Sequence, residues 1–196
     1  MTELATIVAD LAGGMKAADA RHPVARSSRG GRTYSPGIGP HSESDTVRLA
    51  LNELPEYAGC VQREVPYPAA PRSRCDLCIG SDPTWEWCIE IKMLRMLGDN
   101  GKPNDNILMH ILSPYPAHRS ALTDCEKLLA SGLSGRKAIM IYAYDYADWP
   151  AVDAIEAFEL LASRRIRLSP RRFAQADGLV HPVHRCVHVY GWELLG

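Results

Sequence analysis

The sequence lacks the features of membrane, secreted and strongly basic proteins. No apolar run approaches 18 residues, and the N-terminus has no basic segment followed by an apolar one. The net charge is −1, so the overall positive charge of a non-specific DNA-binding protein is also missing. We therefore expect a soluble, cytoplasmic protein with no membrane contact, in which any binding of nucleic acid depends on a local basic surface.

Internal repeats, low-complexity tracts and a glycine-rich phosphate loop are also missing. The six cysteines are scattered, as in reduced intracellular proteins. Cys75-x-x-Cys78 has no second cysteine pair, and on a strand its two side chains point to opposite faces. Three histidines (His181, His184 and His188) lie among valines, which predicts a strand with His184 and His188 on its polar face. A Cys/His zinc protein remains an alternative.

With 196 residues, 46% hydrophobic and 23% charged, the chain has the composition of an ordinary globular protein. Hydrophobic periodicity predicts helices at 2–20, from Ser42, at 105–112, at 118–131 and from Pro150. Strands are predicted at 61–67, on both sides of a Gly-Ser-Asp-Pro turn at 80–83, at 136–146 and near the C-terminus. This order favours an α/β fold. We divide it into residues 1–42, a helix followed by an arm rich in Gly, Pro and Arg, and a domain of residues 43–196.

The most informative segment is the hairpin at 74–95, because its apolar strands also carry charge. Alternation places Glu90 and Lys92 on one face of the second strand, opposite Trp87, Ile89 and Ile91. Asp76 lies on the first strand. If the strands pair, Asp76, Glu90 and Lys92 converge. Buried charges are costly unless they are paired or bind a cation, so the pattern is typical of a divalent-metal hydrolase.

These residues resemble the signature of the PD-(D/E)XK nuclease superfamily. Asp76 matches the acid on one strand, and Glu90-Ile91-Lys92 matches acid-x-Lys on the next, after 13 intervening residues. Cys75 stands where the family name has proline. The family usually adds a glutamate from the preceding helix, for which the chain offers Glu43 or Glu53. The resemblance implies a restriction-endonuclease-like fold, a mixed central sheet flanked by helices.

The resemblance also implies an activity, Mg²⁺-dependent hydrolysis of DNA phosphodiester bonds, in restriction or phage defence. Asp76, Glu90, the main-chain carbonyl of Ile91 and Glu43 are then expected to hold Mg²⁺, or Mn²⁺ in its place. Lys92 is expected to orient water and stabilise the transition state, since its pKa stays high near two carboxylates. The expected partners are double-stranded DNA and a second copy of the chain. The alternative is a non-catalytic nucleic-acid-binding or structural protein with the same fold.

Basic side chains outside the hairpin are candidate phosphate contacts. Arg26, Arg29 and Arg32 lie in the arm, which is otherwise a linker. Arg164 and Arg165 begin a dense arginine cluster after the helix at 150. Two other charged residues, Asp124 and Lys127, are expected to be solvated on the helix at 118–131. Glu43 is either a metal ligand or an acid that stabilises the start of its helix.

Overall fold

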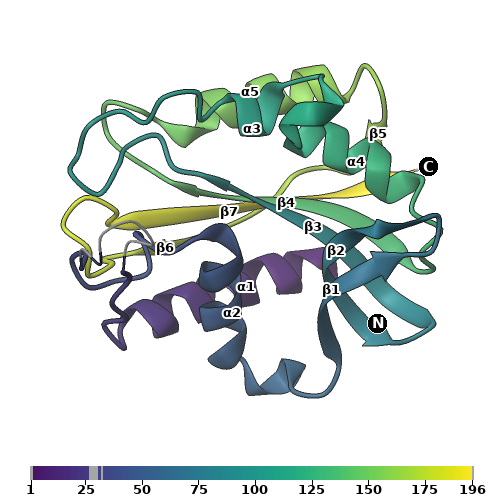
Figure 1. Cartoon of the computed structure of the whole chain (residues 1–196), viewed down its shortest axis with the longest axis horizontal. Helices are drawn as coiled ribbons and strands as arrows, with labels where there is room; N and C mark the ends of the chain where they lie inside the picture. Colours follow the sequence, from purple (N-terminus) through teal and green to yellow (C-terminus); the bar gives the residue numbers. More distant parts are fainter. Residues whose placement is uncertain (1, 27–30, 32, 196) are drawn as a thin grey trace.

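A computed structural model describes residues 2–26, 31 and 33–195. The described chain is a mixed α/β fold, in which a seven-stranded sheet with both parallel and antiparallel pairs is flanked by helices on both faces. In Figure 1, α1 and α2 cover one face, and α3, α4 and α5 cover the other. No helix in this part of the chain has the length and apolar character needed to cross a membrane.

The predicted helices are confirmed, with shorter bounds. They are α1 (Leu4–Asp19), α2 (Glu43–Asn52), α3 (Met109–Leu112), α4 (Ala121–Leu129) and α5 (Ala151–Ala162). Single 3₁₀ turns lie at Pro55–Tyr57 and Pro116–His118. Ser42 caps α2 by accepting a hydrogen bond from the main-chain nitrogen of Asp45, as the sequence predicts.

The sheet contains β1 (Val61–Tyr67), β2 (Ala70–Ser81), β3 (Thr84–Leu94), β4 (Arg136–Tyr144), β5 (Arg167–Leu168), β6 (Arg172–Asp177) and β7 (Cys186–Leu195). The order is β1-β2-β3-β4-β7-β5, and β6 also pairs with β7. Among the strands of the described residues, only β3 and β4 pair in parallel. Strands β5 and β6 are not among the predicted elements, because arginines and a proline interrupt that segment and hide its alternation.

The core fills both faces of β3 and β4, the central parallel pair. In β3, Trp87, Cys88 and Ile89 are fully buried, so both of its faces meet a helical layer. Helix α1 packs against β6, β7 and α2, which buries Leu4, Val8 and Met15 in the same core. A charged side chain on β3 or β4 is therefore shielded from water by the helices that cover each face of the sheet.

Candidate active site

The charged residues of the hairpin lie where β2 and β3 separate. Main-chain pairing between these strands runs from Ser81–Thr84 to Leu77–Ile89 and ends there, one position before Asp76 and Glu90. The Asp76 carboxylate then accepts a hydrogen bond from the main-chain nitrogen of Ile91 at 2.7 Å. The N–H and C=O of one strand residue point to the same edge, so the Ile91 carbonyl also faces this gap.

Glu43 reaches the same edge from the N-terminus of α2. Its carboxylate accepts a hydrogen bond from the main-chain nitrogen of Met93, and it lies 4.0 Å from the Lys92 ammonium. Burial raises the pKa of Glu43 to about 7, although Lys92 opposes the shift. Glu53, the alternative glutamate, is at the other end of α2 and pairs with Arg21 at 3.2 Å. The structure therefore brings Glu43 to the hairpin and leaves Glu53 away from it.

Glu90 is the most deeply buried acid of the motif, with 2% of its surface exposed. It accepts a hydrogen bond from the Tyr67 hydroxyl, and the Lys127 ammonium lies 3.7 Å away. Burial, followed by repulsion from Asp124, raises the pKa of Glu90 to about 8. Burial also raises the pKa of Asp76, against the hydrogen bond from Ile91.

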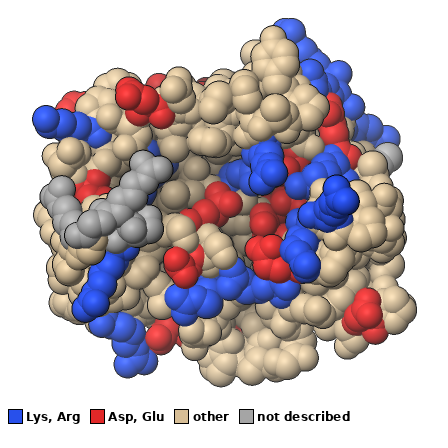
Figure 2. All heavy atoms as spheres, in the orientation of Figure 1, with Lys and Arg blue, Asp and Glu red and all other residues tan. Residues whose placement is uncertain are grey.

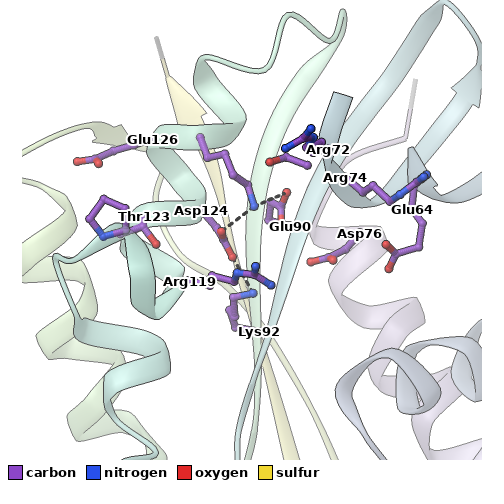
Figure 3. A pocket seen from close by; sticks show the side chains of 13 residues that line it. Glu64, Arg72, Arg74, Asp76, Glu90, Lys92, Arg119, Thr123, Asp124 and Glu126 are labelled. Atoms are coloured by element: carbon purple, nitrogen blue, oxygen red, sulfur yellow. Dashed lines mark hydrogen bonds and ion pairs between the residues drawn. The ribbon is translucent and has the colours of Figure 1, made fainter. Parts of the chain in front are cut away.

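The expectation that Asp124 and Lys127 are solvated is wrong for Asp124, which is 3% exposed. Its carboxylate binds Lys92 at 2.6 Å and Lys127 at 2.8 Å (Figure 3). The sequence contained a signal for this. Ala121, Asp124, Cys125 and Leu128 recur at i, i+3, i+4 and i+7, so Asp124 lies within the apolar stripe of α4.

We call the resulting cluster the carboxylate–lysine site. It comprises four acids and two lysines: Glu43, Asp76, Glu90, Asp124, Lys92 and Lys127. When all six groups are ionised, four negative and two positive charges leave a net charge of −2. Burial first, and then repulsion from neighbouring acids in this excess, raise the pKa values of Glu43 and Glu90.

The site opens into a cavity of about 600 Å³ between α4 and the ends of β1 and β2. Figure 2 shows acidic side chains in a hollow bordered by Lys and Arg. Arg72, Arg74 and Arg119 belong to the cavity lining and are exposed. Glu64 also lines it, and its φ of 56° is unusual for a non-glycine residue within a strand. Sequence reasoning missed Glu64 and these three arginines, because they carry no distinctive spacing.

Of the arginines predicted to contact DNA, the three that the structure describes (Arg26, Arg164 and Arg165) are not part of the cavity lining. Arg26 is exposed and forms an isolated β-bridge with Thr33. Arg29 and Arg32 lie outside the described residues. Arg164 is exposed, and Arg165 pairs at 2.8 Å with Glu126. Since Glu126 lines the cavity, Arg165 lies next to the cavity rim.

A second cluster, the Asp–His cluster, consists of Asp99, His181 and His184. It is the one set of three His, Cys, Asp or Glu side chains in the described ranges whose ligand atoms all lie within 4.8 Å of one another. The prediction that His184 lies on the polar face of a strand is wrong, because His184 precedes β7 and is fully buried. The loop that contains Gly39 packs over the His184 ring so closely that a Cβ at Gly39 would overlap it.

Hydrogen bonding in the Asp–His cluster indicates a structural role. His184 Nε2 lies 3.0 Å from Asp99, and His184 Nδ1 lies 2.8 Å from the Tyr146 hydroxyl. His181 Nδ1 accepts from two main-chain nitrogens, so a neutral ring carries its proton on Nε2, where a metal would have to bind. The Arg95 guanidinium is 3.8 Å from Asp99, which further disfavours a cation. No family model, curated protein or solved structure matches the chain.

Proposed function

We propose that the protein is a metal-dependent nuclease that hydrolyses DNA phosphodiester bonds, built on a restriction-endonuclease-like core. The segment from α2 to β4 contains a helix, three antiparallel strands, the two helices α3 and α4, and a strand parallel to the third. Asp76 on β2 and Glu90-x-Lys92 on β3 occupy the positions of the motif that this chain resembles. The order of elements and the motif support the same assignment.

The observation that carries the proposal is the excess of acids over lysines among the six groups of the carboxylate–lysine site. Its acids are held in a region that burial makes unfavourable for charge, and its net charge of −2 equals in size the charge of one divalent cation. The donors are carboxylate oxygens, which suit hard ions such as Mg²⁺ and Mn²⁺. Asp76, Glu90 and Asp124 line the cavity, and Glu43 lines a smaller pocket that also includes Asp76. Among the described residues these acids do not form a closed three-ligand set, which fits an ion that keeps several waters.

Asp76, Glu90 and Glu43, with the Ile91 carbonyl, would hold such an ion. When bound, the metal would lower the pKa of a coordinated water and neutralise charge on the reacting phosphate. Lys92 would act as a fixed cation. Burial alone would lower the pKa of Lys92, but Glu43 and Asp124 raise it above its ordinary value. The lysine therefore stays protonated near neutral pH, which supports an electrostatic role and disfavours a general base.

A phosphate backbone is the substrate that the cavity rim favours. Arg72 and Arg119 line the cavity, and neither side chain has a hydrogen bond or ion pair within the described part of the chain. They are free to bind phosphate oxygens while the acids hold the metal. Arg26, Arg164 and Arg165 would extend the contact along double-stranded DNA. Two copies of the chain related by twofold symmetry would cleave both strands.

A second candidate is a non-catalytic protein that retains this fold. Asp76 and Glu43 accept hydrogen bonds from the free edge of β3, at Ile91 and Met93, so both acids also serve the structure. In this alternative the acids complete the sheet edge, and the arginines bind nucleic acid without cleaving it.

Plasmid cleavage by the purified protein in Mg²⁺, Mn²⁺, Zn²⁺ or EDTA distinguishes the two. The nuclease is expected to cut in Mg²⁺ or Mn²⁺ and to lose activity in EDTA and in Glu90→Gln. Asp153→Asn is the matched control, because Asp153 is an exposed acid in the first turn of α5, away from the site. A protein that binds plasmid but never cuts it would favour the non-catalytic alternative.

A further inference from the structure

Helix α4 contributes a second half to the carboxylate–lysine site, which the hairpin motif does not include. Ser120 caps the helix by accepting from the main-chain nitrogen of Thr123 at 3.3 Å. The cap fixes the start of α4, and Asp124 and Lys127 follow three residues apart on the side that faces β3. Both line the cavity with Glu90 and Lys92.

Asp124 divides its two carboxylate oxygens between the two lysines. Oδ2 lies 2.6 Å from Lys92 Nζ, and Oδ1 lies 2.8 Å from Lys127 Nζ. An isolated carboxylate buried to 3% exposure would be strongly destabilising, and two ammonium groups compensate it. In turn, the carboxylate holds two cations that would otherwise repel each other.

The position of the Lys127 ammonium group is fixed by neighbouring side chains, as that of Lys92 is. Its ammonium group lies 3.7 Å from Glu90 Oε1 and 5.4 Å from the centre of the Tyr67 ring. The side chain is 35% exposed, so it meets the cavity while its charge is fixed from three sides. In Figure 3, Asp124 points from α4 toward Lys92 on β3.

We propose that Asp124 is a positioning residue that fixes Lys92 and Lys127 as a pair of cations, and that Lys127 is a second phosphate-binding lysine. This inference rests on the proposed function. It adds a residue pair on α4 that the hairpin motif leaves out. Two ammonium groups fixed beside Glu90 would meet a phosphate at two of its oxygens without reorganising during the reaction.

The charged groups that face Lys92 come from four elements: Glu43 on α2, Asp76 on β2, Glu90 on β3, and Asp124 and Lys127 on α4. Asp124 is the only one of them hydrogen-bonded to Lys92 within the described residues. Asp124→Asn removes one negative charge and leaves the shape of the side chain. The Lys92 and Lys127 ammonium groups then lose the anion that holds them 2.6 and 2.8 Å from its two oxygens, so they are no longer fixed as a pair.

The direct test is a double-mutant cycle on stability, which needs no nuclease activity. The free energy of unfolding in urea is measured for Asp124→Asn, Lys92→Met and the double variant. If Asp124 acts by holding Lys92, the losses in the two single variants should not add in the double variant. Asp153→Asn combined with Lys92→Met is the control, and its effects should add. Additive losses for Asp124→Asn and Lys92→Met overturn the proposal.

Cleavage supplies the second readout, and it separates this inference from the proposed function. Asp124→Asn should lower kcat per folded molecule and leave the Mg²⁺ concentration for half-maximal cleavage unchanged, because Asp124 holds the lysines and does not bind the ion. Asp124→Glu should restore most of kcat. A purely structural aspartate would lower activity only in proportion to the loss of folded protein, and that outcome overturns the positioning role. If the parent does not cleave in any metal, the proposed function fails, and the stability cycle still decides the role of Asp124.

Lys127→Met tests the second half of the proposal, and it remains available if Asp124→Asn does not fold. It should reduce the slope of log affinity for double-stranded DNA against log salt by about 0.9, measured in Ca²⁺ to prevent cleavage. Lys102→Met is the control, since Lys102 is exposed in a loop outside the cavity. Equal slopes for Lys127→Met and the parent would remove Lys127 from the phosphate contacts.

Discussion

The two buried clusters contain similar groups and have opposite electrostatics. In the Asp–His cluster, burial alone would raise the pKa of Asp99, but the hydrogen bond from His184 and the charge of Arg95 lower it. In the carboxylate–lysine site, burial raises the pKa of Glu43 to about 7 and of Glu90 to about 8, despite two lysines. The protein stabilises the charge of one acid and destabilises the charges of the others.

The pKa values shift in opposite directions because the two clusters differ in the ratio of acids to basic side chains. One carboxylate in the Asp–His cluster meets a histidine and an arginine, so its charge is already compensated. The carboxylate–lysine site has twice as many acids as lysines and lies beside a cavity. Compensated charge is typical of a structural contact. An excess of buried acid beside a cavity is typical of a site that binds a cation.

The largest expected effect is on catalysis. Asp76→Asn should reduce metal-dependent plasmid cleavage by at least about 10²-fold, because it removes a metal-binding charge. Asp99→Asn should keep cleavage per folded molecule within about threefold of the parent, because Asp99 belongs to a structural contact. Initial rates at saturating Mg²⁺, normalised to folded protein by circular dichroism, measure both. Similar losses in the two variants would show that the clusters do not differ in function.

The same two variants should have the reverse effect on stability. Asp99→Asn weakens a charged hydrogen bond to a buried histidine and should lower the free energy of unfolding by about 1–3 kcal/mol. Asp76→Asn removes repulsion among neighbouring acids and leaves an amide oxygen to accept from Ile91, so stability should stay the same or rise. Urea unfolding at pH 8 without metal measures both. A loss of stability in Asp76→Asn larger than in Asp99→Asn would favour the structural alternative for Asp76.

The hairpin part of the site could be predicted from sequence because it depends on local alternation. Glu90 and Lys92 share a face of one strand, and a short turn brings Asp76 beside them. Glu43 could be predicted only as one of two candidates. Its selection depends on the loop before α2, which Asp19 fixes by accepting from the main-chain nitrogen of Ile38 at 2.8 Å. No local pattern encodes that contact.

The contribution of α4 could not be predicted in the same way. Asp124 is 32 residues from Lys92 in sequence, and the two meet because β3 and β4 pair in parallel across the connection that contains α4. Position in the apolar stripe shows that Asp124 is buried but does not name its partner. The arginine rim is similarly dispersed, with Arg72 on β2 and Arg119 before α4. Tertiary contact alone assembles these residues.

A smaller effect concerns DNA affinity and separates the cavity rim from the arm. Arg72→Ala and Arg119→Ala should each reduce the slope of log affinity against log salt by about 0.9 if each contacts one phosphate. The double variant should lose about twice as much. Arg26→Ala measures whether the interface continues into the arm, and fluorescence anisotropy in Ca²⁺ with a duplex gives all the slopes. Unchanged slopes for the rim variants would place the DNA elsewhere.

The smallest expected effect is a pH-dependent thermal shift on adding metal. Because the folded-state pKa values of Glu43 and Glu90 lie above the ordinary value, these acids favour the folded state below about pH 4.5. That contribution is lost as the pH rises through about 7 and 8. Mg²⁺ binds the ionised acids and must displace protons at pH 6, so it should restore stability at pH 8 and much less at pH 6. With Mg²⁺ at a tenfold excess over its Kd, the increase in Tm at pH 8 should be about 3–6 °C.

The variant Glu90→Gln should remove most of this increase in Tm, and Asp99→Asn should retain it. An equal shift at both pH values, or one that survives in Glu90→Gln, would show that the ion binds away from the raised acids.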